Sequence, residues 1–294
     1  MRQISYKIIA VFFSVLTIAS CSDNTGDNAS GSDSDTASGT KRIDKAQKVF
    51  FTVPSPIEMG NLLRKSKASY DSKILNPVEN LSRYSTSEMK AVNLGVYGTD
   101  MSLASIFGQS QETAFYLKCV SKLAKDLGIE RAFDQELGQR IEASIDEKDS
   151  LLKIIAQAYW ESDAYLKADG RQNISGLIVA GGWIEGLHVA AQIAVKTKNA
   201  DIIARIGEQK LSLDNLIGLL ESYKAEGNSF AILDDLKALN AIYEKVEYTK
   251  SKAEARTDAA QKMTVISGSS KVIVTPEQLI EIKNKIEEIR NKII

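Results

Sequence analysis

The stretch ISGLIVAGGWIEGLHVAAQIA, residues 174–194, is apolar, has helical spacing and contains four glycines. A second glycine-containing stretch, NLGVYGTDMSLAS, occupies residues 93–105. Because a glycine inside a helix costs about 1 kcal/mol relative to alanine, close packing must offset that cost. Small residues follow one face of each segment at spacings of three and four, namely Gly95, Gly98, Ser102 and Ser105 in one and Gly182 and Gly186 in the other. This pattern predicts two paired central helices whose axes approach closely.

The same small faces could instead line a pocket for an apolar ligand. Asp100, Glu185 or His188 would then supply the polar end of the pocket. The candidate ligand-binding residues are Tyr97, Asp100, Trp183, Glu185 and His188. The sequence leaves open whether the two segments form such a pocket or only pack against each other.

Glu185 and His188 form a Glu-x-x-His motif, which places a carboxylate and an imidazole on one helix face. Di-iron carboxylate bundles use this motif twice, and the chain has a single histidine, so a two-metal site of that kind is excluded. A mononuclear metal site or an enzyme site built from this pair with Asp100 or Asp163 remains an alternative. One imidazole is a poor metal signature, and we expect no metal and no cofactor.

The rest of the chain also has helical periodicity, and all four prolines lie at or near expected helix starts. Capping-box spacings begin at Ser55, Asn76, Ser85 and Thr275, and Gly128, Gly170 and Gly227 are expected helix stops. The expected helices cover 56–68, 86–107, 110–127, 133–168 with a break near 144–148, 172–197, 200–225, 229–262 and 276–293. We therefore predict an all-α, multi-helix bundle.

Two further elements are expected near the C-terminus. The segment MTVISGSSKVIVT contains two β-branched runs around Ser267–Ser270, which predicts a small β-hairpin at about 263–274. The last helix, 276–293, is amphipathic and carries an a/d stripe of Leu279, Ile282, Ile286, Ile289 and Ile293. This stripe is expected to dock on the chain's own bundle, with a homodimer through the C-terminal helix as the alternative.

Two internal similarities raise the hypothesis of a duplicated helical unit. Residues 140–155 align without gaps with residues 205–220, and residues 95–104 align more loosely with 181–190. The order of a glycine-containing helix followed by an Arg-Ile…Asp-x-Leu segment thus occurs twice. The two offsets differ, being 65 and 86 residues, so that the repeat is not regular.

The N-terminal residues have the layout of a secretory signal peptide. Arg2 and Lys7 precede a short apolar run, which ends at LTIASC, residues 16–21. This ending resembles the lipobox of bacterial lipoproteins, and the resemblance implies cleavage before Cys21 and lipidation of its thiol. Several acyl chains make membrane attachment effectively permanent. We therefore expect a signal peptide at 1–20 and a membrane anchor at Cys21.

Residues 21–40 contain no large apolar side chain after the cysteine, so they cannot offset the entropy of ordering and are expected to form a flexible tether. The tether is acidic, through Asp23, Asp27, Asp33 and Asp35, and resembles the surface-export signals of some Bacteroidota lipoproteins. A charged spacer explains the same residues. The expected location is the outer membrane, facing the periplasm or the cell surface, with residues 41–294 as a single helical domain.

Charge and cysteine content limit the partners and the chemistry. The chain has 37 basic and 38 acidic residues; removing Arg2, Lys7 and the four tether aspartates leaves 35 and 34, so the body carries about +1. The body has no excess of positive charge of the kind that indicates nucleic-acid binding. Cys119 lies in an apolar periodic run and is expected to be buried without a disulfide. No nucleophile and base pair is recognisable, so no catalytic residue is predicted.

Several stretches of the body resemble an uncharacterised helical lipoprotein family common in Bacteroidota. They are FFTVPSPIEMGNLL, the LNP turn at 75–77, NLGVYGTD, and the final hairpin with its helix. The imelysin peptidase-like family has a Gly-x-His-x-x-Glu motif, from which this chain departs because Ala191 stands three residues after His188. The expectation is thus a lipid-anchored, cell-envelope helical protein that is a non-enzymatic binding or scaffolding protein.

Overall fold

The computed structural model describes residues 62–63, 68–129, 135–144, 147–224, 230–250, 254–258, 263–267 and 270–294. Five predicted features lie outside this part of the chain: the signal peptide, Cys21, the tether, the cap at Ser55 and the helix stop at Gly227. Of the helix expected at 56–68, residues 62–63 and 68 are described; residues 62–63 are helical and residue 68 is not.

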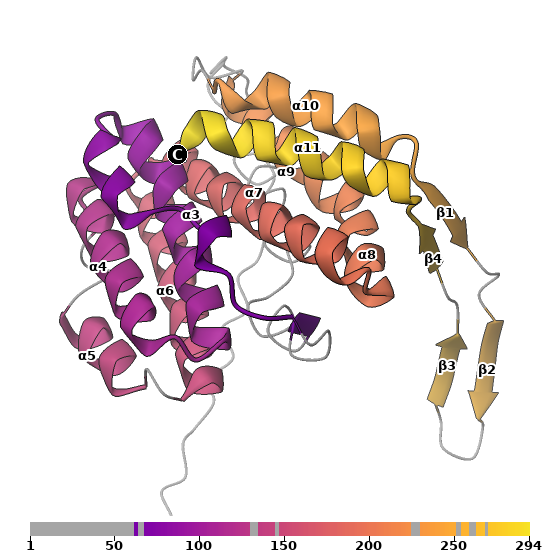
Figure 1. Cartoon of the computed structure of the whole chain (residues 1–294), viewed down its shortest axis with the longest axis horizontal. Helices are drawn as coiled ribbons and strands as arrows, with labels where there is room; N and C mark the ends of the chain where they lie inside the picture. The colour runs from indigo at the N-terminus through magenta and orange to yellow at the C-terminus, as the bar shows by residue number, and fades with distance from the viewer. Residues whose placement is uncertain are drawn as a thin grey trace, which may run out of the picture.

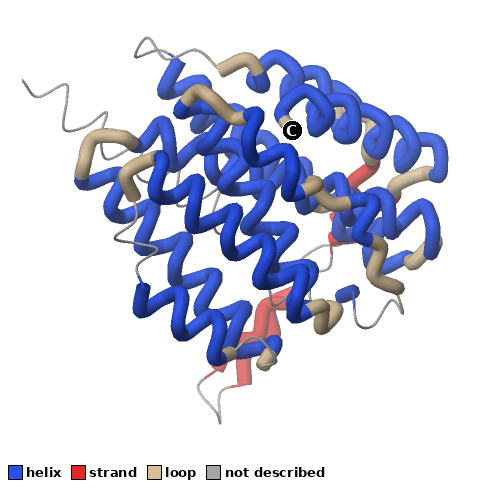
Figure 2. The backbone as a smooth tube through the Cα atoms, turned by 60° about the vertical axis from the view of Figure 1, so that its left-hand side comes forward, coloured by secondary structure: helices blue, strands red, loops and turns tan. Residues whose placement is uncertain are grey.

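The described residues form an all-α bundle with a small antiparallel β-ribbon, which confirms the predicted fold class (Figures 1 and 2). Two short 3-10 helices, η1 (Ser72–Ile74) and η2 (Val78–Arg83), precede the bundle. The α-helices are α3 (Ser87–Ile106), α4 (Ser110–Asp126), α5 (Gln135–Ala143), α6 (Lys148–Ala168), α7 (Gln172–Thr197), α8 (Ala200–Gly207), α9 (Gln209–Lys224), α10 (Ile232–Tyr243) and α11 (Pro276–Ile293).

The central pair of the bundle is α3 and α7, whose backbones touch. A Cβ atom added to Gly95 would lie 2.0 Å from the carbonyl oxygen of Ile178, and one added to Gly181 would lie 1.9 Å from that of Val92. Only glycine permits this approach at those two positions. The prediction of paired helices is confirmed, with one correction: Gly186 has no atom within 4 Å of an added Cβ, so it is not part of the contact.

The remaining helices surround this pair (Figure 1). On one side α4 and α6 pack against α3, and on the other α8, α9 and α11 pack against α7, with α10 between α9 and α11. Gly98, on the small face of α3, receives Tyr159 of α6: an added Cβ would lie 1.7 Å from the tyrosine hydroxyl. Protein atoms therefore fill the space beside Gly95, Gly98 and Gly181.

Local signals position most helix ends. Gly128 and Gly170 adopt left-handed φ values of 66° and 70°, after α4 and α6, as expected. Thr275 and Gln278 form a complete capping box at the start of α11. The prediction at Ser85 was one residue early, because Thr86 is the N-cap of α3. Asn76 does not cap η2 and is used in a buried network described below.

The β-ribbon differs from the predicted hairpin. Strand β1 (Glu247–Lys250) pairs with β4 (Ser270–Ile273), and β2 (Glu254–Asp258) pairs with β3 (Met263–Ser267). Both β-branched runs lie on the returning arm, so a turn at 267–270 was wrong. The outgoing arm was predicted as part of a helix at 229–262, because EYTK and EARTD have weak strand propensity. Cross-strand pairing overrides that local preference.

The C-terminal helix α11 docks on its own chain, along α7 and α10. Leu279, Ile282, Ile286 and Ile289 of the predicted stripe are buried. The contact uses the face that a coiled-coil dimer would need, so such a dimer would require α11 to leave this position. Figure 1 shows the C-terminal end of α11 beside α7, close to α3.

The hypothesis of a duplicated unit agrees with one feature of the fold. Residues 140–155 run from α5 into α6, and residues 205–220 run from α8 into α9, so each aligned segment joins a short helix to a longer one. The helix expected at 200–225 is in fact divided at Glu208. Helix α4 lies between α3 and α5, whereas α8 follows α7 directly, and this explains the unequal offsets.

Among the described helices, α7 alone is long and apolar enough to cross a membrane by length and composition. The most apolar 18-residue window of α7 is 89% buried inside the protein. This burial is typical of a core helix.

Candidate functional site

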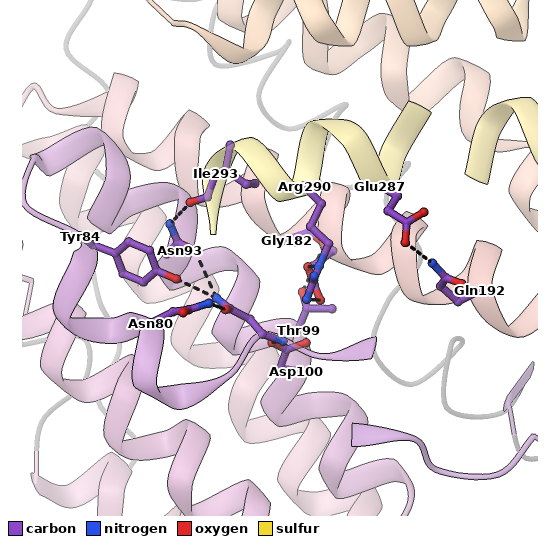
Figure 3. A network of polar contacts seen from close by, with 12 residues as sticks. Asn80, Tyr84, Asn93, Thr99, Asp100, Gly182, Gln192, Glu287, Arg290 and Ile293 are labelled. Carbon is purple, nitrogen blue, oxygen red and sulfur yellow. Dashed lines mark hydrogen bonds and ion pairs between the residues drawn. The ribbon is translucent and has the colours of Figure 1, made fainter. Parts of the chain in front are cut away.

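A cluster of ionisable side chains is buried where α3, α7 and α11 meet (Figure 3). It consists of Asp100 from α3, Glu185 and His188 from α7 and Arg290 from α11, and we call it the buried polar cluster. Asp100 and Glu185 are fully buried, and His188 and Arg290 expose 3% and 6% of their surface. The cluster contains three of the five candidate ligand-binding residues.

Glu185 and Arg290 form a bidentate ion pair. Arg290 Nε donates to Glu185 Oε2 at 2.7 Å, and Nη2 donates to Oε1 at 2.9 Å. Burial alone would lower the pKa of Arg290, but the adjacent Glu185 carboxylate raises it above its ordinary value. Both carboxylate oxygens of Glu185 are therefore occupied by a permanently charged group of the same chain.

Asp100 lies beside this pair and is poorly compensated. Its Oδ2 accepts the backbone N–H of Asn76 at 3.1 Å, and its Oδ1 has no hydrogen-bond partner. Burial raises the pKa of Asp100 well above its ordinary value, and the neighbouring Glu185 raises it further, while Arg290 partly opposes the shift. The physical cause is that two carboxylates share one guanidinium in a place without solvent.

His188 lies one helical turn after Glu185 and is equally enclosed. Burial lowers its pKa, and Arg290 acts in the same direction, against the opposite effects of Glu185, Glu287 and a backbone hydrogen bond at Ile74. Its Nδ1 atom has no hydrogen-bond partner. This environment therefore favours the neutral imidazole.

A hydrogen-bonded network of asparagines lies beside the cluster, where the segment before α3 (residues 68–86) packs. Asn76 Nδ2 donates to the hydroxyl of Tyr84 at 2.9 Å and to Asn93 Oδ1 at 3.4 Å, and Asn80 donates to Asn76. Asn93 Nδ2 in turn donates to the carbonyl of Ile293 in α11 at 2.7 Å. The segment before α3 and the last helix of the chain are thus tied together over the cluster.

The other predicted site residues lie apart from the cluster centre. Tyr97 donates to the carbonyl of Pro77 at 2.9 Å and packs against other tyrosine rings. Trp183 donates to Gln209 Oε1 at 3.3 Å, at the start of α9. Both rings are buried and have different partners, so the alternative left open by the sequence, that the two segments only pack against each other, describes their surroundings.

Asp163, the further carboxylate of the metal alternative, is bound elsewhere. It accepts hydrogen bonds from Lys167 at 2.5 Å and from Ser175. Ser175 precedes Glu185 by ten residues, which is about 15 Å along a helix. Within the described ranges, no group of three or more His, Cys, Asp and Glu side chains is placed to hold a metal ion.

The sequence analysis missed Arg290 and misread Asn76. Arg290 follows Ile286 by four residues, and this charged position on the apolar stripe of α11 was a usable signal of a buried ion pair. No comparable signal existed for Asn76, because Asn-Pro is an ordinary turn and cap pattern.

The cluster can hold charge and protons, but it presents no open face to a substrate: its side chains are enclosed by α3, α7, α11 and the segment 68–86. The role that these contacts give the cluster is structural: it joins α11 to the central helices.

Comparisons of the chain with protein-family models, with curated proteins and with solved structures find no match.

Proposed function

We propose that this chain is a lipid-anchored protein of the cell envelope, held at the outer membrane through Cys21, and that it acts as a non-enzymatic binding or scaffolding protein. The observation that carries the proposal is the lipobox-like sequence LTIASC, followed by nineteen residues without a large apolar side chain. An anchor and a flexible tether at the start of a helical body suit a protein that presents a surface to partners.

The contacts of the body support the non-enzymatic part of the proposal. Several polar groups that could have served a ligand are bonded within the chain: Glu185 to Arg290, one oxygen of Asp100 to Asn76, and Trp183 to Gln209. A metal ion at Glu185 would have to displace the guanidinium of Arg290. A partner would therefore bind the exterior of the bundle or the β-ribbon.

Intact mass and metal content of protein extracted from its native membrane test the proposal, beside a Cys21→Ala variant. An acylated chain that begins at Cys21 and a variant that leaves the membrane fraction are expected. An unmodified Cys21 would contradict the anchor. A stoichiometric metal that is lost in His188→Ala would contradict the non-enzymatic reading and favour the site at Glu185 and His188.

A further inference from the structure

Two acids and one permanently charged base, Arg290, meet in the buried polar cluster, and the charges of these three groups do not balance if both acids are ionised. Arg290 supplies one positive charge to Glu185 and Asp100, and both of these carboxyl groups are fully buried. Burying an uncompensated carboxylate is costly, and a buried group responds by becoming neutral. A single proton on the two acids makes Asp100, Glu185 and Arg290 neutral as a set.

The hydrogen bonds indicate which acid carries the proton. Glu185 receives two charge-assisted hydrogen bonds from Arg290, which favour its ionised form. Asp100 receives one, from a backbone N–H, and keeps a free oxygen. The negative charge of Glu185 acts in the same direction as burial and raises the pKa of Asp100, so the proton is favoured on Asp100.

We propose that Asp100 and Glu185 hold a single proton between them, and that this proton is a condition for docking the C-terminal helix α11 through Arg290. Helix α11 meets the cluster at its last turns, where Arg290 reaches Glu185 and the Ile293 carbonyl accepts from Asn93. Loss of the proton leaves a net negative charge between α3 and α7, and release of α11 lets water reach it.

Other titratable groups around Asp100 do not compete for this role near neutral pH. Burial raises the pKa of each surrounding phenol and thiol above its ordinary value; these groups are Tyr70, Tyr97, Tyr116, Tyr159 and Cys119. The pKa of Cys119 reaches about 11. The pKa of His188 is lowered by burial, and that of Glu287, which faces His188 from α11, is lowered by Lys283. Arg290 stays charged.

The direction of the pH effect follows from the raised pKa of Asp100. Above the ordinary carboxyl range, the docked state holds one proton more than the opened state, so raising the pH favours opening. The stabilisation of the docked state by this proton is complete below the ordinary carboxyl pKa. It is lost as the pH rises through the raised pKa of Asp100 in the docked state. Over that window the opening equilibrium increases by about tenfold per pH unit.

Hydrogen exchange of the α11 backbone amides measures this opening, in the full chain between pH 5 and 8, after correction for the intrinsic exchange rate. In the wild type, the protection factor of the α11 amides is expected to decrease with rising pH, by up to about tenfold per pH unit. Asp100→Asn is uncharged, has nearly the shape of a protonated aspartate and cannot titrate, so its protection should not show that fall. His188 and Cys119 are present in both forms, and their effects cancel in the comparison.

Asp163→Asn is the matched control, because Asp163 is also a buried aspartate but has its own lysine partner. This variant should lose stability and keep the pH dependence of the wild type. Infrared spectroscopy of the wild type at pH 7 adds a readout without any substitution: the carbonyl stretch of an un-ionised carboxylic acid is expected. Absence of that band, or an Asp100→Asn variant with the pH dependence of the wild type, would overturn the proposal.

Discussion

Removing the guanidinium of Arg290 is the sharpest perturbation of the core, because it leaves Glu185 without its partner. In Arg290→Met the apolar part of the side chain is retained and the two hydrogen bonds, at 2.7 and 2.9 Å, are lost. Glu185 is fully buried, so neither of its oxygens can gain water without a rearrangement of α11.

The expected magnitude follows from the burial of both partners. Breaking a buried ion pair by removing one member costs about 3–5 kcal/mol, because an uncompensated charge remains inside. The free energy of unfolding of the whole domain is about 5–15 kcal/mol. Arg290→Met should therefore remove a large part of the stability at pH 7, and Glu185 or Asp100 should then take up an additional proton.

The assay is urea unfolding followed by circular dichroism, with the double variant Glu185→Leu and Arg290→Met as a second arm. Replacing both members of a buried pair by apolar residues is often neutral or stabilising, so the double variant should recover most of the loss. Lys237→Ala, which breaks the half-exposed pair with Glu221, is the control and should leave the stability unchanged.

Two results would refute this reasoning. If Arg290→Met lowered the free energy of unfolding by less than about 1 kcal/mol, the pair would be screened by solvent in the way that surface ion pairs are. A double variant that is less stable than Arg290→Met would mean that the geometry of the pair, and not the unpaired charge, stabilises the docked helix.

Three further predictions concern packing, capping and reactivity. Gly181→Ala should destabilise the chain by about 1–3 kcal/mol or more, because the added Cβ meets a backbone carbonyl at 1.9 Å. Gly186→Ala, whose added Cβ has no atom within 4 Å, should instead stabilise the chain by up to about 1 kcal/mol. Thermal unfolding of both variants measures the difference. Thr275→Ala should cost about 1 kcal/mol in urea unfolding, since it removes the capping box of α11, and an unchanged midpoint would contradict this. Cys119 should react with a thiol reagent at pH 8 only after denaturation, because it is buried and its pKa is raised to about 11; rapid labelling of the folded Cys21→Ala protein would show otherwise.

Local sequence signals were sufficient for most of the helices. Gly128 and Gly170 end α4 and α6 because a left-handed φ there is accessible to glycine at little cost, and Thr275 starts α11 through its side-chain cap. These interactions span a few residues, so the sequence shows both partners at once. The glycine face of α3 also indicated the central pair, although Gly181 rather than Gly186 completes the contact on α7.

The candidate site was predictable only in part. Asp100, Glu185 and His188 were proposed as the polar end of a candidate pocket on the two central helices; the structure buries all three, with Glu185 close enough to act on the pKa of both Asp100 and His188. Tyr97 and Trp183 were candidates for the same site, but they bond to Pro77 and Gln209, and helical spacing does not specify which helix packs on which face.

The sequence by itself determined an all-α body, the limits of most helices and the central place of the two glycine-containing segments, since each depends on periodicity or on a cap. Only the tertiary structure decided the pairing of the β-ribbon, the partner of Glu185 and the role of Asn76. Glu185 and Arg290 are 105 residues apart, and Asn93 and Ile293 are 200 apart. Contacts at such separations depend on the packing of whole helices, which no local pattern encodes.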